Sequence, residues 1–174
     1  MELPNRKSTR LKDYDYSTPG AYFVTICTKG RREILSEIIV GADVLDGPQN
    51  ILYPYGEIAN KHLLAMHNFY DNISIVKYVI MPNHIHLLIQ ITDGNNGPPR
   101  TSVPTKSLLS NFISTFKRFC NKEYGENVWQ RSFHDHIIRN EQDYLKIAEY
   151  IDTNPLKWEL DCFYNSNENV KSSQ

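Results

Sequence analysis

The chain of 174 residues lacks the features that mark several protein classes. Its three cysteines are odd in number and far apart, so they predict neither a disulfide framework nor a cysteine metal site. No apolar run is long enough to span a bilayer, and the N-terminus has no apolar segment of a secretory signal. We therefore expect a cytoplasmic protein with no membrane partner.

Several common catalytic motifs are also missing, namely a glycine-rich phosphate loop, Gly-x-Ser-x-Gly and Cys-x-x-Cys. The formal net charge is only −1, so the overall charge does not call for a nucleic-acid partner. The charge is unevenly distributed, because residues 1–32 carry a net charge of +4 and residues 141–174 a net charge of −4. A basic half suits a phosphate backbone, although ordinary surface asymmetry explains the difference equally well.

The length predicts a single domain of residues 1–164, followed by a polar, disordered tail at 165–174. Within the domain, residues 1–20 are expected to form a basic N-terminal arm. Residues 93–105 are rich in glycine, proline and small polar side chains, which is typical of a flexible loop.

The hydrophobic pattern predicts an α+β fold. Runs rich in β-branched and aromatic residues predict strands at 21–28, at 73–80, at 84–91 and within 129–138. Apolar residues at helical spacing predict helices at about 57–70, 108–124 and 141–154, and glycines and prolines predict a loop at 41–56. The order β-α-β-β-α-β is that of the ferredoxin-like, split βαβ topology: an antiparallel sheet with helices on one face, here with an added C-terminal helix.

A His-Ile-His run opens the strand expected at 84–91. Because strand side chains alternate between faces, His84 and His86 point the same way, roughly 7 Å apart along the strand, while Ile85 points into the opposite layer. Two imidazoles on one face can share a divalent metal ion. The alternative is a pair of ordinary histidines on a half-exposed strand.

The last helix carries candidates for a third ligand and a nucleophile. Tyr150 and Asn154 are four residues apart and therefore lie on one helix face. An amide oxygen suits Mg²⁺ or Mn²⁺, and a tyrosine beside a metal-polarised phosphate can form a covalent intermediate. Alternatively, Tyr150 is a core aromatic residue and Asn154 a helix cap, or Tyr144, near the opposite helix face, is the nucleophile.

His134 and His136 form a second alternating pair, which is either a rival metal site or, as we favour, a structural support of the same pocket. Scattered cations could follow a DNA backbone, with aromatic side chains stacking on bases. These candidate DNA-binding residues are Arg6, Lys7, Arg10, Lys12, Lys117, Arg118 and Arg131.

Three separated motifs, at residues 78–88, 129–139 and 150–155, resemble those of the small His-hydrophobic-His (HUH) single-tyrosine transposases. The second and third are similar to the branch associated with repetitive extragenic palindromes (REP). The segments 10–16 and 22–28 are also similar to many members, so the resemblance covers about residues 6–158.

The resemblance implies a role for each matching position. His84 and His86 match the metal-binding histidines, Asn154 matches the third ligand of Mg²⁺ or Mn²⁺, and Tyr150 matches the nucleophile on a catalytic C-terminal helix. The family cleaves single-stranded DNA beside an imperfect hairpin, leaving a 5′-phosphotyrosine and a free 3′-hydroxyl. Rejoining reverses the attack.

The resemblance implies a metal-dependent transposase whose partner is single-stranded or hairpin DNA. A homodimer is possible, because the insertion-sequence branch works as dimers. Two alternatives remain open. One is a domesticated regulator that binds hairpin DNA without turnover, and the other is a metallohydrolase that attacks a small substrate with a metal-bound water.

Overall fold

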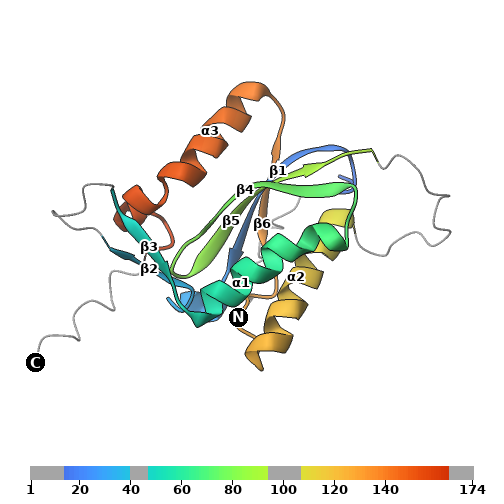
Figure 1. Cartoon of the computed structure of the whole chain (residues 1–174). Helices are drawn as coiled ribbons and strands as arrows, with labels where there is room; N and C mark the ends of the chain where they lie inside the picture. The colour runs from blue at the N-terminus through green and yellow to red at the C-terminus, as the bar shows by residue number, and fades with distance from the viewer. Residues whose placement is uncertain (1–13, 40–46, 94–106, 165–174) are drawn as a thin grey trace, which may run out of the picture.

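The computed structural model describes residues 14–39, 47–93 and 107–164. Its centre is a four-stranded antiparallel sheet in the order β4-β5-β1-β6 (Figure 1). The strands are β1 (Gly20–Cys27), β4 (Ile73–Ile80), β5 (His84–Ile91) and β6 (His134–Ile138). This order is that of the ferredoxin-like fold, so the predicted fold class is confirmed.

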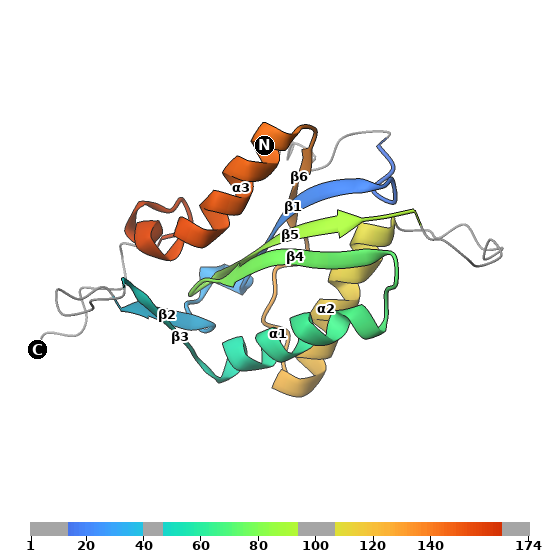
Figure 2. The ribbon, with the colours of Figure 1, turned by 45° about the horizontal axis from the view of Figure 1, so that its top comes forward.

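The helices divide between the two faces of the sheet (Figures 1 and 2). Helices α1 (Pro54–Ala65) and α2 (Leu108–Tyr124) cover one face, and α3 (Glu141–Thr153) crosses the other, against β4 and β5. The described residues also form three short 3₁₀ helices: η1 (Lys29–Arg31), η2 (Met66–Asn68) and η3 (Pro155–Leu160). No helix among the described residues is long and apolar enough to cross a membrane.

The hydrophobic core lies between the sheet and the pair α1 and α2. Alternate residues of the strands, such as Val24 and Ile85, meet Phe112 and Phe116 of α2 there. Ser107 caps α2, since its side chain accepts a hydrogen bond from the Ser110 amide. Gly125 ends the helix in the left-handed conformation that favours glycine.

The prediction of a loop at 41–56 was wrong for its second half. Strand β3 (Gln49–Leu52) pairs with β2 (Ser36–Ile39) in a separate hairpin, and α1 already begins at Pro54, where proline suits the first turn. Gly56 permits this arrangement, because a β-carbon there would come within 1.9 Å of the Leu35 carbonyl oxygen. The expected helix end near residue 70 was also late, because the chain tightens into η2 after residue 65.

Parts of three further predictions lie outside the described residues: residues 1–13 of the basic arm, residues 94–105 of the loop, and the tail at 165–174. The helix expected at 141–154 is α3, but the 3₁₀ helix η3 that follows it was not predicted.

Candidate metal and tyrosine site

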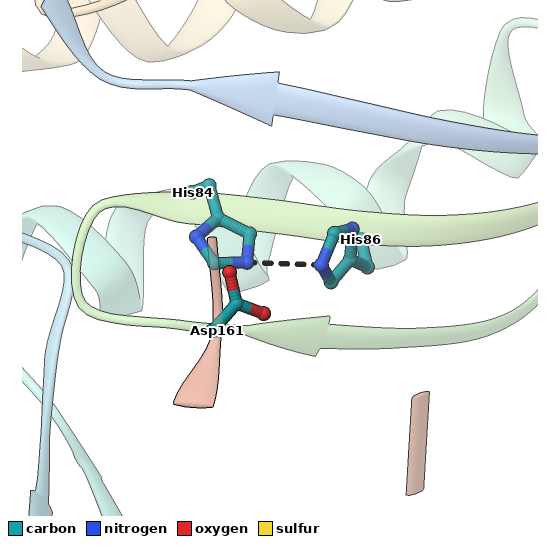
Figure 3. A group of neighbouring side chains, drawn as sticks. All are labelled: His84, His86 and Asp161. Atoms are coloured by element: carbon teal, nitrogen blue, oxygen red, sulfur yellow. Dashed lines mark hydrogen bonds between the residues drawn. The ribbon is translucent and has the colours of Figure 1, made fainter. Parts of the chain in front are cut away.

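Strand β5 sets the orientation of the two histidines. His84 and His86 face α3, whereas Ile85 between them belongs to the core on the opposite face. Both imidazoles are buried, and their Nε2 atoms lie 3.0 Å apart (Figure 3). Two adjacent ligands of an octahedral ion, each at about 2.1 Å, are roughly 3 Å apart. The pair is therefore spaced to share one divalent ion.

The other nitrogen of each ring has a partner of its own. His84 Nδ1 lies 2.9 Å from Asn83 Oδ1. Asn83 Nδ2 donates a hydrogen bond to the Phe163 carbonyl, and this bond fixes the orientation of the Asn83 side-chain amide. Because an amide oxygen can only accept, His84 Nδ1 donates and its Nε2 carries the free lone pair. His86 Nδ1 lies 2.9 Å from the hydroxyl of Thr25, its neighbour on β1.

Burial keeps the histidines neutral. It lowers the pKa of His84 to about 4. Burial also lowers the pKa of His86 well below its usual range, and the neighbouring His84 lowers it further. Both rings are thus uncharged near neutral pH, as metal ligands must be.

Helix α3 brings Tyr150 to the histidines. Its hydroxyl lies 3.4 Å from His86 Nε2 and donates to Asp161 Oδ2 at 3.0 Å. The Tyr150 ring also packs edge-on against Phe23. Burial raises the pKa of Tyr150, and the Asp161 carboxylate raises it further, so the hydroxyl keeps its proton at neutral pH.

Asn154 is the C-cap residue of α3 and is 1% exposed. Its Nδ2 donates to Asp161 Oδ2 at 3.0 Å, but its Oδ1 has no hydrogen-bond partner among the described residues. An unpaired buried acceptor costs about 1–3 kcal/mol, and an oxygen of this kind is a ligand that Mg²⁺ and Mn²⁺ accept. The donor set of His84, His86 and Asn154 therefore fits a divalent ion.

Asp161 is the member of the site that sequence reasoning missed. Ligand atoms of His84, His86 and Asp161 all lie within 4.8 Å of one another (Figure 3). Asp161 follows η3, in a stretch where the hydrophobic pattern predicted no element. The only signal in the sequence for Asp161 was an acidic side chain soon after the Tyr-x-x-x-Asn run, which extends from Tyr150 to Asn154.

The second histidine pair lies on the same face, because His134 and His136 stand opposite Thr25 and Phe23 in the sheet. His136 is exposed and its Nε2 lies 2.8 Å from Asp143 of α3, while the exposed His134 is near the Phe163 ring. The direct partners of the buried histidines are instead Asn83 and Thr25.

Three of the predicted DNA-binding residues gather in one place. Lys117, Arg118 and Arg131 line a surface pocket of about 300 Å³ where the chain passes from α2 to β6. Lys117 also donates to the carbonyls of Gln130 and Ser132. The other four candidates, Arg6, Lys7, Arg10 and Lys12, lie outside the described residues.

Comparison with known proteins finds relatives along most of the chain. The profile of the IS200-like transposases matches residues 18–154. An uncharacterized protein of Haemophilus influenzae is 34% identical over 178 residues, which cover 93% of this chain and 94% of that protein. The REP-associated tyrosine transposase of Escherichia coli K12 is 29% identical over 80 residues, 46% of this chain and 42% of its own.

A solved structure has the same fold. A REP-associated tyrosine transposase bound to a REP hairpin superposes with a TM-score of 0.59 at 21% identity. The match covers 86% of this chain and 73% of that one.

Proposed function

The chain belongs to the IS200-like transposase family, and on that premise we propose that it cleaves and rejoins single-stranded DNA through a 5′-phosphotyrosine intermediate. The observation that carries the proposal is the position of the Tyr150 hydroxyl, 3.4 Å from one of two buried, neutral imidazoles. A nucleophile and candidate metal ligands thus converge on one point of the sheet.

In this proposal His84, His86 and Asn154 hold Mg²⁺ or Mn²⁺. The bound ion would act as a Lewis acid that polarises an oxygen of the scissile phosphate. Asn83 and Thr25 would keep the imidazoles aimed at it, which is the usual task of groups behind metal ligands.

Tyr150 supplies the attacking oxygen. Its proton is directed at Asp161 Oδ2, which leaves a lone pair of the phenolic oxygen free for phosphorus. The bond from tyrosine to phosphorus forms as the bond to the 3′-oxygen breaks, and the departing oxygen ends with a proton as a 3′-hydroxyl. One phosphodiester replaces another, so rejoining by the reverse attack needs no external energy source.

The DNA partner in this proposal is a hairpin with a single-stranded flank. A REP hairpin is bound in the solved relative of the same fold. The pocket of Lys117, Arg118 and Arg131 offers cations to a phosphate backbone. Because α2 and α3 cover opposite faces of the sheet (Figure 1), DNA that reaches both this pocket and Tyr150 would pass around the margin of the sheet.

A covalent-adduct assay tests the proposal. Labelled single strands from both flanks of the gene are incubated with the protein and Mn²⁺ and run on a denaturing gel. We expect label that migrates with the protein, that disappears in Tyr150→Phe and that persists in the matched variant Tyr144→Phe. Hairpin binding by Tyr150→Phe should stay at the wild-type level.

Two results would contradict the proposal. Hairpin binding without any adduct would support a regulator that binds DNA without turnover. Cleavage that proceeds at the wild-type rate in Tyr150→Phe would exclude this tyrosine as the nucleophile and would support attack by a metal-bound water.

A further inference from the structure

The two histidines and the asparagine leave the candidate site without a negative charge. Divalent Mg²⁺ and Mn²⁺ are hard cations that favour carboxylate oxygens, and imidazole and amide ligands bring no charge. We propose that Asp161 is a fourth protein ligand of the divalent ion and supplies its anionic oxygen. The assignment rests on the proposed metal site and adds a residue that lies beyond the Tyr-x-x-x-Asn run.

Proximity is the first support. Ligand atoms of Asp161, His84 and His86 lie within 4.8 Å of one another, and the carboxylate stands beside both imidazoles (Figure 3). Ligands on opposite sides of an ion, each at about 2.1 Å, are roughly 4.2 Å apart. The observed spread is therefore only slightly wider than an occupied site requires.

The carboxylate is held in place before any ion binds. Its Oδ1 accepts a hydrogen bond from the Phe163 amide at 2.8 Å, and the Asp161 amide donates to the Trp158 carbonyl. Trp158 is buried, and its ring lies 5.9 Å from that of His84. The turn after η3 is thus fixed against the histidines, which limits the entropy lost on binding an ion.

The carboxylate of Asp161 is the anionic oxygen donor in this cluster. It accepts hydrogen bonds from the Phe163 amide and from Asn154 Nδ2, and such donors favour the charged form of a carboxyl group.

The same carboxylate oxygen orients two other members of the site. Asp161 Oδ2 accepts from Asn154 Nδ2 and from the Tyr150 hydroxyl, each at 3.0 Å. Asn154 Nδ2 is engaged by Asp161, whereas Asn154 Oδ1 has no hydrogen-bond partner among the described residues and remains available as a ligand. Asp161 would thus bind the ion and at the same time accept the hydrogen bond of the Tyr150 hydroxyl.

The test measures Mn²⁺ binding to the full chain without DNA, by the loss of the free-ion signal in electron paramagnetic resonance. Asp161→Asn keeps the volume and an acceptor oxygen but removes the charge. We expect its Kd for Mn²⁺ to rise at least about tenfold, since even groups behind the ligands are worth about 10–100-fold. Asp161→Glu, which retains the charge, should bind Mn²⁺ more tightly than Asp161→Asn.

Asp152→Asn is the matched control. It makes the same substitution on α3, where the Asp152 carboxylate pairs with Lys77 at 2.6 Å. Asp152 does not belong to the cluster that Asp161 forms with the two histidines. We expect its Kd for Mn²⁺ to equal that of the wild type. An equal loss in both variants would mean that the overall charge of this face, rather than ligation by Asp161, sets the affinity.

A second readout reports ligation directly. At saturating Mn²⁺, a water molecule should replace the lost carboxylate in Asp161→Asn, so water-proton relaxation by the bound ion should become faster than in the wild type. Unchanged relaxation together with unchanged Kd would overturn the proposal, as would faster DNA cleavage at unchanged Kd, because Asp161 would then obstruct the site.

His84→Ala separates this inference from the proposed function. If His84→Ala loses Mn²⁺ binding and adduct formation while Asp161→Asn keeps wild-type affinity, Asp161 is not a ligand but the metal site stands. If His84→Ala binds Mn²⁺ normally, the metal site itself is wrong, and the assignment of Asp161 falls with it.

Discussion

His86 shows how one side chain depends on a residue far away in the sequence. Its ring is buried, and its Nδ1 is held by the Thr25 hydroxyl on the neighbouring strand, which leaves Nε2 facing His84. Without that partner the ring could rotate or exchange its tautomer. On the proposed metal site, the hydroxyl of Thr25 would therefore influence metal binding through His86.

Replacement of this hydroxyl gives a test at the residue scale. In Thr25→Val the ring of His86 loses the partner of its Nδ1, so we expect Mn²⁺ affinity to fall about 10-fold or more. Isothermal titration with MnCl₂ measures the change. Thr115→Val is the control, because it removes a hydroxyl on α2 that contacts the Tyr70 hydroxyl and not a histidine. Equal Mn²⁺ affinity in Thr25→Val and Thr115→Val would show that the Thr25 contact is not needed.

The sequence predicted some of these neighbours and not others. Alternation along a strand correctly placed His84 and His86 on one face, and helical spacing correctly placed Tyr150 and Asn154 on one side of α3. Thr25 was not predicted because the hydrophobic pattern does not say which residue of one strand stands opposite which residue of another. Asp161 was not predicted because its position depends on the path of the turn after η3.

Helix α3 is the element that positions Tyr150, and it is only lightly packed. Ile151 is its buried residue, whereas Leu145 remains 59% exposed. Local interactions therefore matter for its stability. Asn140 caps its first turn by accepting a hydrogen bond from the Asp143 amide at 2.8 Å, and Glu141 and Asp143 add negative charge near the N-terminal end of the helix dipole.

We expect loss of this cap to make α3, and with it Tyr150, more mobile. Asn140→Ala should lower the free energy of unfolding by about 1 kcal/mol, whereas Asn140→Ser, which can still cap, should retain most of it. Urea denaturation measures the difference, and hydrogen exchange should show faster opening of α3 in Asn140→Ala. If the Ala and Ser variants have the same stability and the same exchange in α3, the cap contributes little.

At this scale the long, regular elements were predictable and the irregular ones were not. The strands at 73–80 and 84–91 have the predicted bounds, because their β-branched and apolar runs are continuous. Strand β3 of the separate hairpin was missed because the glycines and prolines within 41–56 indicated a loop, and its partner β2 was not predicted either. Each of its strands has four residues, too few for a clear period of two.

In the whole molecule, the hydrophobic core and the candidate site lie on opposite faces of the sheet, but the same strands contribute residues to both. The face under α1 and α2 holds the core, and the face under α3 holds the candidate site (Figure 2). Successive residues of β5 serve one face and then the other, as Ile85 does between the two histidines. A change in the charge of either histidine should therefore change the free energy of unfolding of the whole domain.

This coupling gives a prediction for stability against pH in the metal-free protein. Burial lowers the pKa of His84 from 6.5 to about 4 in the folded state. As the pH falls below about 6.5 the unfolded chain takes up a proton that folded His84 refuses, so the free energy of unfolding decreases until the pH passes about 4. His84 alone should account for a loss of about 2 kcal/mol between pH 7 and pH 5.

Urea denaturation of chelator-treated protein across this range measures the loss. His84→Gln removes one of the two buried titrating rings, so its stability should depend less steeply on pH than that of the wild type. A residual slope should persist, because burial and the neighbouring ring also lower the pKa of His86. The same slope in His84→Gln as in the wild type would mean that His84 does not resist protonation, and that the folded protein can accommodate a charge between β5 and α3.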